Sequence, residues 1–287
     1  MASAASEDRD ILNRFSALRQ HSRGGVLTPN KPVTLLWALE RVERGMPRLT
    51  PFVDAEQELQ PLLDACGTPG TAPSYAFWRL QNDGLWEVVS YGELPPRSGD
   101  KEPKITALRA HASGGFEALV YDRLMARPSL RRDAMRLLDR QLAQVLPRKP
   151  LSNEEAPIWE TVRRRARDRA FRHSVLAAYE SGCAVCDLGL TLMLQAAHVW
   201  SHSEGGPDSV DNGVPLCTFH HPLFDAGLFT WDRERRLVVS SRWRDSLRGD
   251  MPSLHEFAGR PLRDPRRSDL RVQERYLTWH RRHVFRS

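Results

Sequence analysis

A cluster of cysteines and histidines in the second half of the chain has the residue types that bind metals. Cys183 and Cys186 are separated by two residues, and Cys217 and His220 repeat this spacing. Such pairs hold a four-coordinate zinc ion from two tight turns that lie far apart in the sequence. The spacing therefore predicts a structural zinc site built from these four residues.

Three further residues lie between and just after these pairs, in the order His198, Asn212, His221. Hydrolysis of a phosphodiester needs a base for the attacking water, a divalent cation for the developing charge, and a group that orients the base. Residues of these types can supply all three functions. Together with the zinc pairs, this order resembles that of the HNH endonucleases, whose ββα-metal motif is often stapled by zinc.

The resemblance implies a role for each residue. His198, at the end of the apolar segment 190–198, is expected to be the general base, and Asn212 to hold its imidazole ring. His221 opens the next predicted helix and is expected to bind the catalytic cation, Mg²⁺ or Mn²⁺. Asp225 lies four residues later on the same helix face, where it could be a second ligand.

The sequence departs from the commonest HNH pattern at two positions. Ala197 stands where many relatives have a metal ligand before the base, and His220 stands where cysteine is more usual. Neutral imidazole is still a good zinc ligand. We expect His202 to be a solvated residue and Cys66 to be a core residue, and we expect no disulfides because few cysteines are typical of a reducing compartment.

The composition favours a polyanionic partner. The chain has 287 residues, 40% hydrophobic content, a net charge of +6 and a pI of about 9.4. No apolar run is long enough to span a membrane and the first ten residues are polar, so we expect a cytoplasmic protein. This charge suits a polyanion without demanding one, and the resemblance to HNH endonucleases implies double-stranded DNA as the partner. The preference for arginine over lysine is also typical of a GC-rich genome.

A domain boundary is expected at residues 147–158, where prolines and polar residues interrupt the helical pattern. This linker separates domain 1–146 from domain 159–287, and helices are predicted at 129–146 and 158–182 on either side of it. The second helix is rich in arginine, which is usually a solvated face but here precedes the HNH-like motif. Its candidates for contact with the DNA backbone are Arg164, Arg165 and Arg169.

The N-terminal domain is predicted to be mostly helical. Amphipathic patterns indicate helices at 11–25, 27–45 and 51–67, the last with Gly67 as a C-terminal cap. The aromatic segment 74–90 is predicted to be β-structure with a turn at Asn82-Asp83-Gly84. Beyond the HNH-like motif, 228–243 is predicted to be two strands and 254–262 and 270–285 to be closing helices.

A second resemblance rests on two segments of this domain, NKPVTLLWAL and SYAFWRLQNDGLWEV. They resemble the sulfur-binding domain of type IV, McrA-like restriction enzymes, which recognise phosphorothioated DNA. Sulfur is larger, softer and less strongly hydrated than oxygen, so an apolar pocket rimmed with cations can prefer it to a normal phosphate oxygen. The fold class that the two resemblances imply is α+β and multidomain, with a mostly helical N-terminal domain and a zinc-stapled ββα-metal domain.

The second resemblance also implies the residues around the sulfur. Tyr75-Ala76 matches a Tyr-Pro step of the family, so a proline of the pocket wall is missing here, and Asn30, Lys31 and Pro32 precede a helix at the rim. The same tripeptide could be only a helix start, and the neighbouring aromatic residues are typical of a core. Further candidates for contact with phosphates or bases are Arg23, Arg79, Lys104 and Arg109.

The sequence therefore predicts a restriction endonuclease that selects phosphorothioated duplex DNA and hydrolyses a phosphodiester bond near the modification, with zinc as a structural ion. Because an HNH domain carries one active site, cleavage of both strands requires either two protomers, as in a homodimer, or two successive nicks. Three alternatives remain at this level. The chain could be an HNH nuclease that reads a methylated base, a nuclease for unmodified DNA, or a zinc-stapled DNA-binding protein without catalysis.

Overall fold

A computed structural model describes residues 4–19, 22–23, 26–67, 71–92, 94, 102–146, 157–245 and 254–287. The chain forms two compact units, Met1–Ala166 and Arg167–Ser287, and the division falls within one helix, α8 (Ile158–Ala178). Most of the expected linker, residues 147–156, lies outside the described residues. The proposed domain limits therefore stay a prediction.

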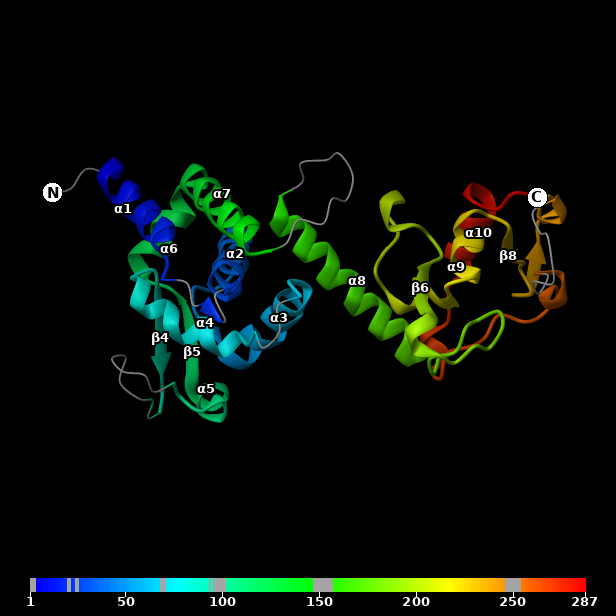
Figure 1. Ribbon diagram of the computed structural model, residues 1–287, viewed down its shortest axis with the longest axis horizontal. Helices are drawn as coiled ribbons and strands as arrows, with labels where there is room; N and C mark the ends of the chain where they lie inside the picture. Colours follow the sequence, from blue (N-terminus) through cyan, green and yellow to red (C-terminus); the bar gives the residue numbers. More distant parts are fainter. Residues whose placement is uncertain are drawn as a thin grey trace. The chain divides into compact units, whose positions relative to one another are not determined.

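The first unit is mostly helical, and its described residues also form a two-stranded sheet and a three-stranded sheet (Figure 1). Its helices are α1 (Ala4–Ser16), α2 (Asn30–Glu43), α3 (Phe52–Ala65), α4 (Pro73–Arg79), α5 (Ile105–His111), α6 (Ala118–Ala126) and α7 (Pro128–Val145). Its strands are β1 (Ser22–Arg23), β2 (Val26–Leu27), β3 (Thr50–Pro51), β4 (Trp86–Ser90) and β5 (Ala112–Phe116), and a short 3₁₀ helix spans Leu80–Asp83.

Helix α2 is the central helix of the first unit. Eleven of its residues are buried, including the run from Asn30 to Leu39, and it contacts α3, α4, α6 and α7. A helix that is apolar on most sides must be covered on most sides, so the neighbouring helices surround it. The predicted helices at 27–45 and 51–67 are confirmed, and Gly67 adopts a left-handed φ of +71° after α3.

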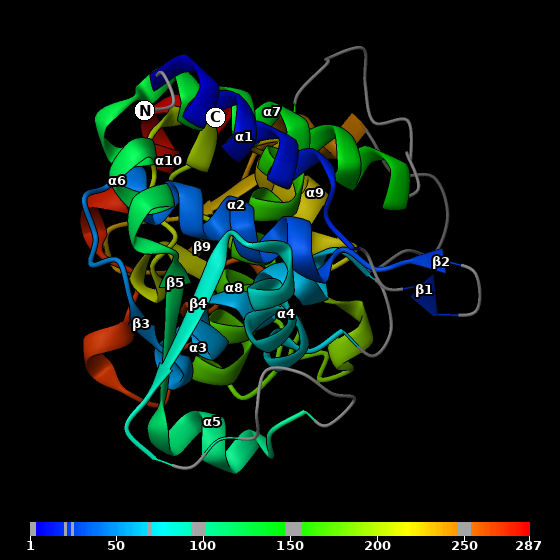
Figure 2. The ribbon, with the colours of Figure 1, turned by 90° about the vertical axis from the view of Figure 1, so that its left-hand side faces the viewer.

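Aromatic side chains join the sheet of the first unit to its helices. In the three-stranded sheet the strands lie in the order β3-β5-β4, and neighbouring strands are antiparallel (Figure 2). Phe77 of α4 packs edge-on against Phe52 of α3 and Trp86 of β4, with ring centroids 4.9 and 5.7 Å apart. Edge-to-face pairs of this kind stabilise a core beyond the area that they bury.

The prediction for segment 74–90 is wrong in its first half. The segment begins as helix α4, and only Trp86–Ser90 forms a strand. Pro73 occupies the first turn, where its fixed φ favours a helix, and Ala76, Phe77 and Trp78 are all buried in this conformation. The predicted turn is confirmed, because Gly84 has a φ of +71°. The helix predicted at 11–25 also differs, because α1 ends at Ser16 and does not continue to the glycines that were expected to end it.

The second unit contains the ββα arrangement that the sequence predicts. Strands β6 (Leu194–His198) and β7 (Gly213–Cys217) pair antiparallel and are followed by α9 (His220–Asp225). The hairpin of β8 (Phe229–Trp231) and β9 (Leu237–Val239) forms a separate sheet. The chain closes with α10 (Glu274–His283), whereas the other predicted closing helix is only a 3₁₀ turn at Leu254–Phe257.

The core of the second unit packs around Phe224 of α9. Phe229 and Trp231 of β8 contact this ring, and the imidazole of His280 stacks on it with a centroid distance of 3.8 Å. Burial lowers the pKa of His280 to about 4. His280 is therefore a neutral core residue that anchors α10 beside α9. Among the described residues, none of the helices has the length and apolar character needed to cross a membrane.

Candidate functional site

The second unit contains a cleft of about 870 Å³ next to its ββα arrangement. His198 reaches the cleft from the end of β6, and His221 and Asp225 reach it from α9. Trp279 and His283 of α10 line the same cleft. Residues separated by more than 80 positions in the sequence thus meet in one cavity, and three of them are the predicted catalytic residues.

His198 is held by contacts on its edge and on its face. Its Nε2 lies 2.7 Å from Oδ1 of Asp208, and Phe171 of α8 stacks on the ring at 3.9 Å and 11°. The other oxygen of Asp208 pairs with Nε of Arg167 at 3.0 Å. When Nε2–H donates to the carboxylate, Nδ1 keeps the free lone pair that a general base needs.

The sequence interpretation missed Asp208, Arg167 and Phe171. Asp208 lies in the loop between β6 and β7, and no fixed spacing connects it with His198. Phe171 and Arg167 belong to a helix that comes before the motif altogether. The one sequence signal for Asp208 was a carboxylate between His198 and Asn212.

The side chain of Asn212 contacts backbone atoms of the loop between β6 and β7. Its side chain is fully buried, accepts a hydrogen bond from the backbone N–H of Trp200 at 2.8 Å, and donates to the backbone oxygens of Trp200 and Pro207. Among the described contacts it makes none with the imidazole of His198. These bonds fix the loop that carries Asp208, the hydrogen-bond partner of His198, and the predicted contact of Asn212 with the imidazole stays a prediction.

Gly213, directly after Asn212, explains how the stack on His198 is possible. It pairs with His198 across β6 and β7, and a Cβ atom here would lie 2.5 Å from Val175 and 2.8 Å from Phe171. Any larger residue would displace the ring of Phe171 from its position. Asn212 therefore fixes the loop between β6 and β7, and Gly213 leaves room for the ring of Phe171 that stacks on His198.

His221 is oriented by a residue that the sequence interpretation also missed. Its Nδ1 lies 2.6 Å from Oε1 of Gln195 on β6, and its Nε2 lies 3.4 Å from Oδ2 of Asp225. With Nδ1–H donated to the amide oxygen, the lone pair of Nε2 is available to a cation. Burial lowers the pKa of His221, opposed in part by Asp225, so the ring favours the neutral form that binds metals.

The predicted zinc residues form a compact cluster beside this site. The ligand atoms of Cys183, Cys186, Cys217 and His220 all lie within 4.8 Å of one another. The two sulfurs of Cys186 and Cys217 are 3.9 Å apart, and Nδ1 of His220 is 3.1 Å from Sγ of Cys217. These separations suit tetrahedral coordination, in which each ligand is about 2.0 to 2.3 Å from the metal.

One thiol of the cluster, that of Cys217, has a lowered pKa, whereas burial raises the pKa of Cys186. A hydrogen bond from Cys183 lowers the pKa of Cys217 to about 3 and raises the pKa of Cys183 itself. Zn²⁺ makes its cysteine ligands thiolates, because the cation replaces the shared proton. The donor set is three cysteines and one histidine, largely buried, which is the composition of a closed structural zinc site.

The candidate arginines on α8 differ in exposure. Arg164 is exposed and Arg165 is half-buried. Arg169 is exposed and interacts with another group of the protein. Arg172 on the same helix binds the backbone oxygens of Thr191 and Leu194, so it holds the polypeptide chain and not a ligand. The role of the first three in binding DNA stays a prediction.

The predicted residues of the sulfur pocket lie on α2 and α4 of the first unit, two helices that pack against each other. Asn30 and Lys31 begin α2, and the amide nitrogen of Asn30 donates to the backbone oxygen of Ala72, just before α4. The amide oxygen of Asn30 is buried without a partner. Lys31 forms an ion pair with Asp83 at 2.5 Å, and the two side chains are only 6% and 2% exposed. The charge of Lys31 is therefore already neutralised inside the protein.

The two residues of the expected pocket wall differ in accessibility. Tyr75 is half-buried, and its burial raises the pKa of the phenol, so the hydroxyl stays protonated. Ala76 is fully buried in the core and Pro32 is buried at the start of α2. In this conformation Tyr75 is thus the residue of the wall that a ligand can reach.

The other predicted cations of the first unit are mostly paired with carboxylates. Arg79 contacts Glu102 at 3.2 Å, and Arg109 forms two bonds with Glu56 at 2.6 and 3.0 Å. Lys104 is exposed directly before α5. The backbone of Arg23 belongs to β1, but its side chain lies outside the described residues.

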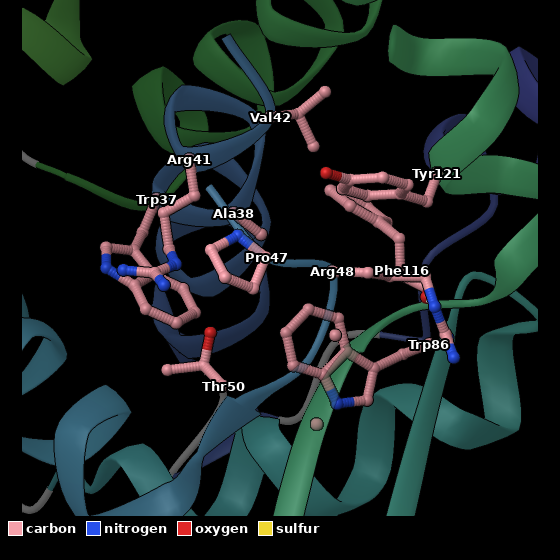
Figure 3. Close-up of a pocket in the computed structure, with 12 residues that line it drawn as sticks. Trp37, Ala38, Arg41, Val42, Pro47, Arg48, Thr50, Trp86, Phe116 and Tyr121 are labelled. Atoms are coloured by element: carbon pink, nitrogen blue, oxygen red, sulfur yellow. The ribbon is translucent and has the colours of Figure 1, made fainter. Parts of the chain in front are cut away.

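A small cavity on the other side of α2 is not a ligand site (Figure 3). Trp37 and Arg41 of α2 line it together with Trp86 and Tyr121, and the guanidinium of Arg41 lies over the ring of Trp37 at 5.1 Å. The indole nitrogen of Trp86 is buried there without a partner. The cavity measures about 10 Å³, which is room for one water molecule at most.

Comparisons with known proteins identify both units. A family model described as "ScoMcrA-like, DNA sulfur-binding domain" matches residues 8–153, and one described as "HNH endonuclease" matches residues 183–232. No curated protein matches the chain.

The chain also resembles solved structures. The sulfur-binding domain of ScoMcrA complexed with phosphorothioated DNA is 25% identical with a TM-score of 0.44, and the match covers 54% of this chain and 97% of that one. The corresponding complex of SprMcrA is 25% identical with a TM-score of 0.43, and the match covers 56% of this chain and 96% of that one. Because the first family model spans more than half of the chain, the protein belongs to the family of ScoMcrA-like DNA sulfur-binding domains and carries an HNH endonuclease domain.

Proposed function

We propose that the protein is a restriction endonuclease that recognises phosphorothioated duplex DNA and hydrolyses a phosphodiester bond near the modification. One observation carries the proposal. A chain that belongs to a sulfur-binding family also contains a cleft in which His198, bonded to Asp208, shares a cavity with His221 and Asp225. The first feature selects a substrate, and the second has the groups that its hydrolysis requires.

His198 acts as the general base in this proposal. Asp208 accepts the hydrogen bond from Nε2–H, so Nδ1 can take a proton from the attacking water. As His198 gains positive charge, the carboxylate of Asp208 stabilises the imidazolium, and Arg167 keeps that carboxylate in place. Asn212 and Phe171 hold the loop and the ring, which keeps the base in a single orientation.

His221 and Asp225 would hold the catalytic cation, Mg²⁺ or Mn²⁺. Gln195 fixes the ring of His221 so that Nε2 and Oδ2 of Asp225 face each other. A bound divalent cation supplies charge stabilisation to the phosphate and to the leaving oxygen. Ala197 is buried and has no ligand atom, so two protein ligands leave the remaining positions to water and substrate.

The sulfur is proposed to bind near the start of α2, around Tyr75, Pro32 and Asn30. The phenol ring offers an apolar face, and the free N–H groups at the start of a helix attract an anion. Lys31 supports the pocket from within the protein, because its ion pair with Asp83 joins α2 to the turn after α4. A normal phosphate oxygen would lose hydration against the apolar face, whereas sulfur loses much less.

Double-strand cleavage would need two copies of the chain or two successive nicks, because the described residues contain one such cleft. The experiment compares cleavage of two duplexes of identical sequence, with and without a phosphorothioate, in the presence of Mg²⁺ or Mn²⁺. The proposal expects products only from the modified duplex and none from the variant His198→Ala. Equal cutting of both duplexes would refute the specificity, and full cutting by the variant would refute the role of His198.

A further inference from the structure

Three ligand atoms gather on one side of the catalytic cleft, apart from His221 and Asp225. They belong to His198, His202 and Asp208, and all lie within 4.8 Å of one another. Oδ1 of Asp208 is 2.7 Å from Nε2 of His198 and 3.4 Å from Nδ1 of His202. The carboxylate oxygen thus lies between two imidazole nitrogens, and both histidines line the cleft.

The loop between β6 and β7 creates this arrangement. His202 begins a 3₁₀ turn (His202–Glu204) just after the strand that ends at His198, and the loop then returns to place Asp208 beside both rings. Asn212 fixes the return by its bonds to the backbone of Trp200 and Pro207. The position of the three donors is therefore set by the fold and not by flexible side chains alone.

Two imidazole nitrogens and one carboxylate oxygen are a ligand set that suits borderline divalent ions. Zn²⁺ binds such sets with distances of about 2.0 to 2.2 Å and keeps a fourth position for water. Mg²⁺ prefers oxygen ligands and binds two imidazoles poorly. We propose that His198, His202 and Asp208 form a second cation site in the cleft, which takes Zn²⁺ or a similar borderline ion and inhibits the nuclease when filled.

The inhibition follows from the role of His198, so this part rests on the proposed function. A cation on Nε2 of His198 replaces the hydrogen bond to Asp208 and moves the remaining ring proton to Nδ1. The nitrogen that should accept a proton from water is then blocked. Arg167 contacts the other oxygen of Asp208 and competes with the ion, so binding should be weaker than at the cysteine cluster.

A count of bound zinc tests the site without any measurement of cleavage. The full-length protein is dialysed against buffered Zn²⁺, and its metal content is measured for wild type, His202→Asn, Asp208→Ala and His221→Asn. We expect wild type and His221→Asn to bind one zinc ion that His202→Asn and Asp208→Ala do not bind. As a matched control, His173→Asn changes an exposed histidine on α8 and should keep the wild-type count. Equal zinc content in His202→Asn and wild type would overturn the proposed site.

The inhibition is tested by titrating Zn²⁺ into the cleavage reaction at constant Mg²⁺. Removal of one of three ligands should weaken inhibition by roughly tenfold or more, so His202→Asn should need that much more Zn²⁺ for the same effect. The readout is the ratio of each protein's rates with and without Zn²⁺, so any change in the Mg²⁺ rate of His202→Asn, which lines the cleft and contacts Asp208, is divided out. Identical inhibition of wild type and His202→Asn would overturn the inhibitory role. A wild-type protein that does not cut at all would instead refute the proposed function, and the zinc count would still stand.

Discussion

The predicted functional residues of the two units differ in how accessible they are and in how many of them are paired with an opposite charge. In the second unit, His198, His221 and Asp225 share a cleft with nitrogen and oxygen atoms that a ligand can reach. In the first unit, Lys31 is buried in an ion pair, and Arg79 and Arg109 are paired at the surface. The cleft of the second unit thus leaves ligand atoms accessible, whereas the candidate sulfur site pairs most of its cations with carboxylates.

This difference corresponds to the chemistry of the two tasks. Metal binding and proton transfer need particular atoms at fixed distances, so they leave residue types at recognisable spacings. Discrimination of sulfur from oxygen depends on an apolar face and on weak hydration, which many residues can supply. A paired lysine fits the second task better than a free one, because a free cation would also attract an ordinary phosphate.

The largest effect is expected at the cysteine cluster. Cys183→Ser should remove zinc and unfold the second unit, because structural zinc contributes on the order of 10 kcal/mol to such domains. Zinc content and thermal melting monitored by circular dichroism measure this change. Cys66→Ser is the matched control, since Cys66 is a buried cysteine of the first unit whose thiol donates a hydrogen bond to the backbone oxygen of Leu62. A stable, zinc-free second unit in Cys183→Ser would contradict the structural role.

The next effect concerns the base and its carboxylate. His198→Ala should lower single-turnover cleavage by about 10²- to 10⁴-fold, the usual contribution of a general base. Asp208→Asn should lower it less, because an amide oxygen still accepts the bond from Nε2–H but does not stabilise an imidazolium. The acidic limb of its pH–rate profile should therefore change, which a purely structural effect would not cause. A normal rate and profile for Asp208→Asn would contradict the dyad.

The buried ion pair of the first unit distinguishes structure from recognition. Lys31→Met leaves the buried carboxylate of Asp83 without its ion-pair partner, although the backbone N–H of Arg19 still donates to it, and should cost about 3 to 5 kcal/mol of stability in urea unfolding. The double variant Lys31→Met, Asp83→Leu removes both charges and should regain most of that loss. If the double variant also binds modified DNA normally, Lys31 supports the fold. If it is stable but does not bind, Lys31 contacts the DNA directly and our comparison of the two units is wrong.

A smaller effect depends on pH and involves His280. Its pKa is about 4 in the folded protein and 6.5 in a free chain, so between these values only the unfolded protein gains the proton. The stability contribution is complete above pH 6.5 and falls by about 3 kcal/mol as the pH decreases to 4. His280→Gln should show a weaker decrease between pH 7 and 4.5 in urea unfolding, and His173→Gln should behave as wild type. Equal slopes for all three would contradict a buried neutral His280.

The sequence was sufficient where a residue acts through its neighbours in the chain. The pair Cys217 and His220, and the pair His221 and Asp225, are joined by a turn or a helix, so their spacing already fixes their geometry. Asp208, Gln195 and Phe171 could not be found in this way, because each reaches its histidine through tertiary packing. The same limit applies to α4, where burial of three consecutive residues against the core overrides the β preference of the aromatic side chains.

The burial of Lys31 could not be predicted from the sequence either, because its partner Asp83 lies 52 residues away and was expected only as part of a turn.

We propose that recognition of phosphorothioated DNA and hydrolysis of the DNA backbone belong to different units of one chain. The most direct measurement is the affinity of His198→Ala, as the full-length protein, for two duplexes that differ only in one phosphorothioate. The account predicts that this variant cuts neither duplex but binds the modified one at least about tenfold more tightly, a difference of 1.4 kcal/mol or more. Equal affinities for the two duplexes would contradict it.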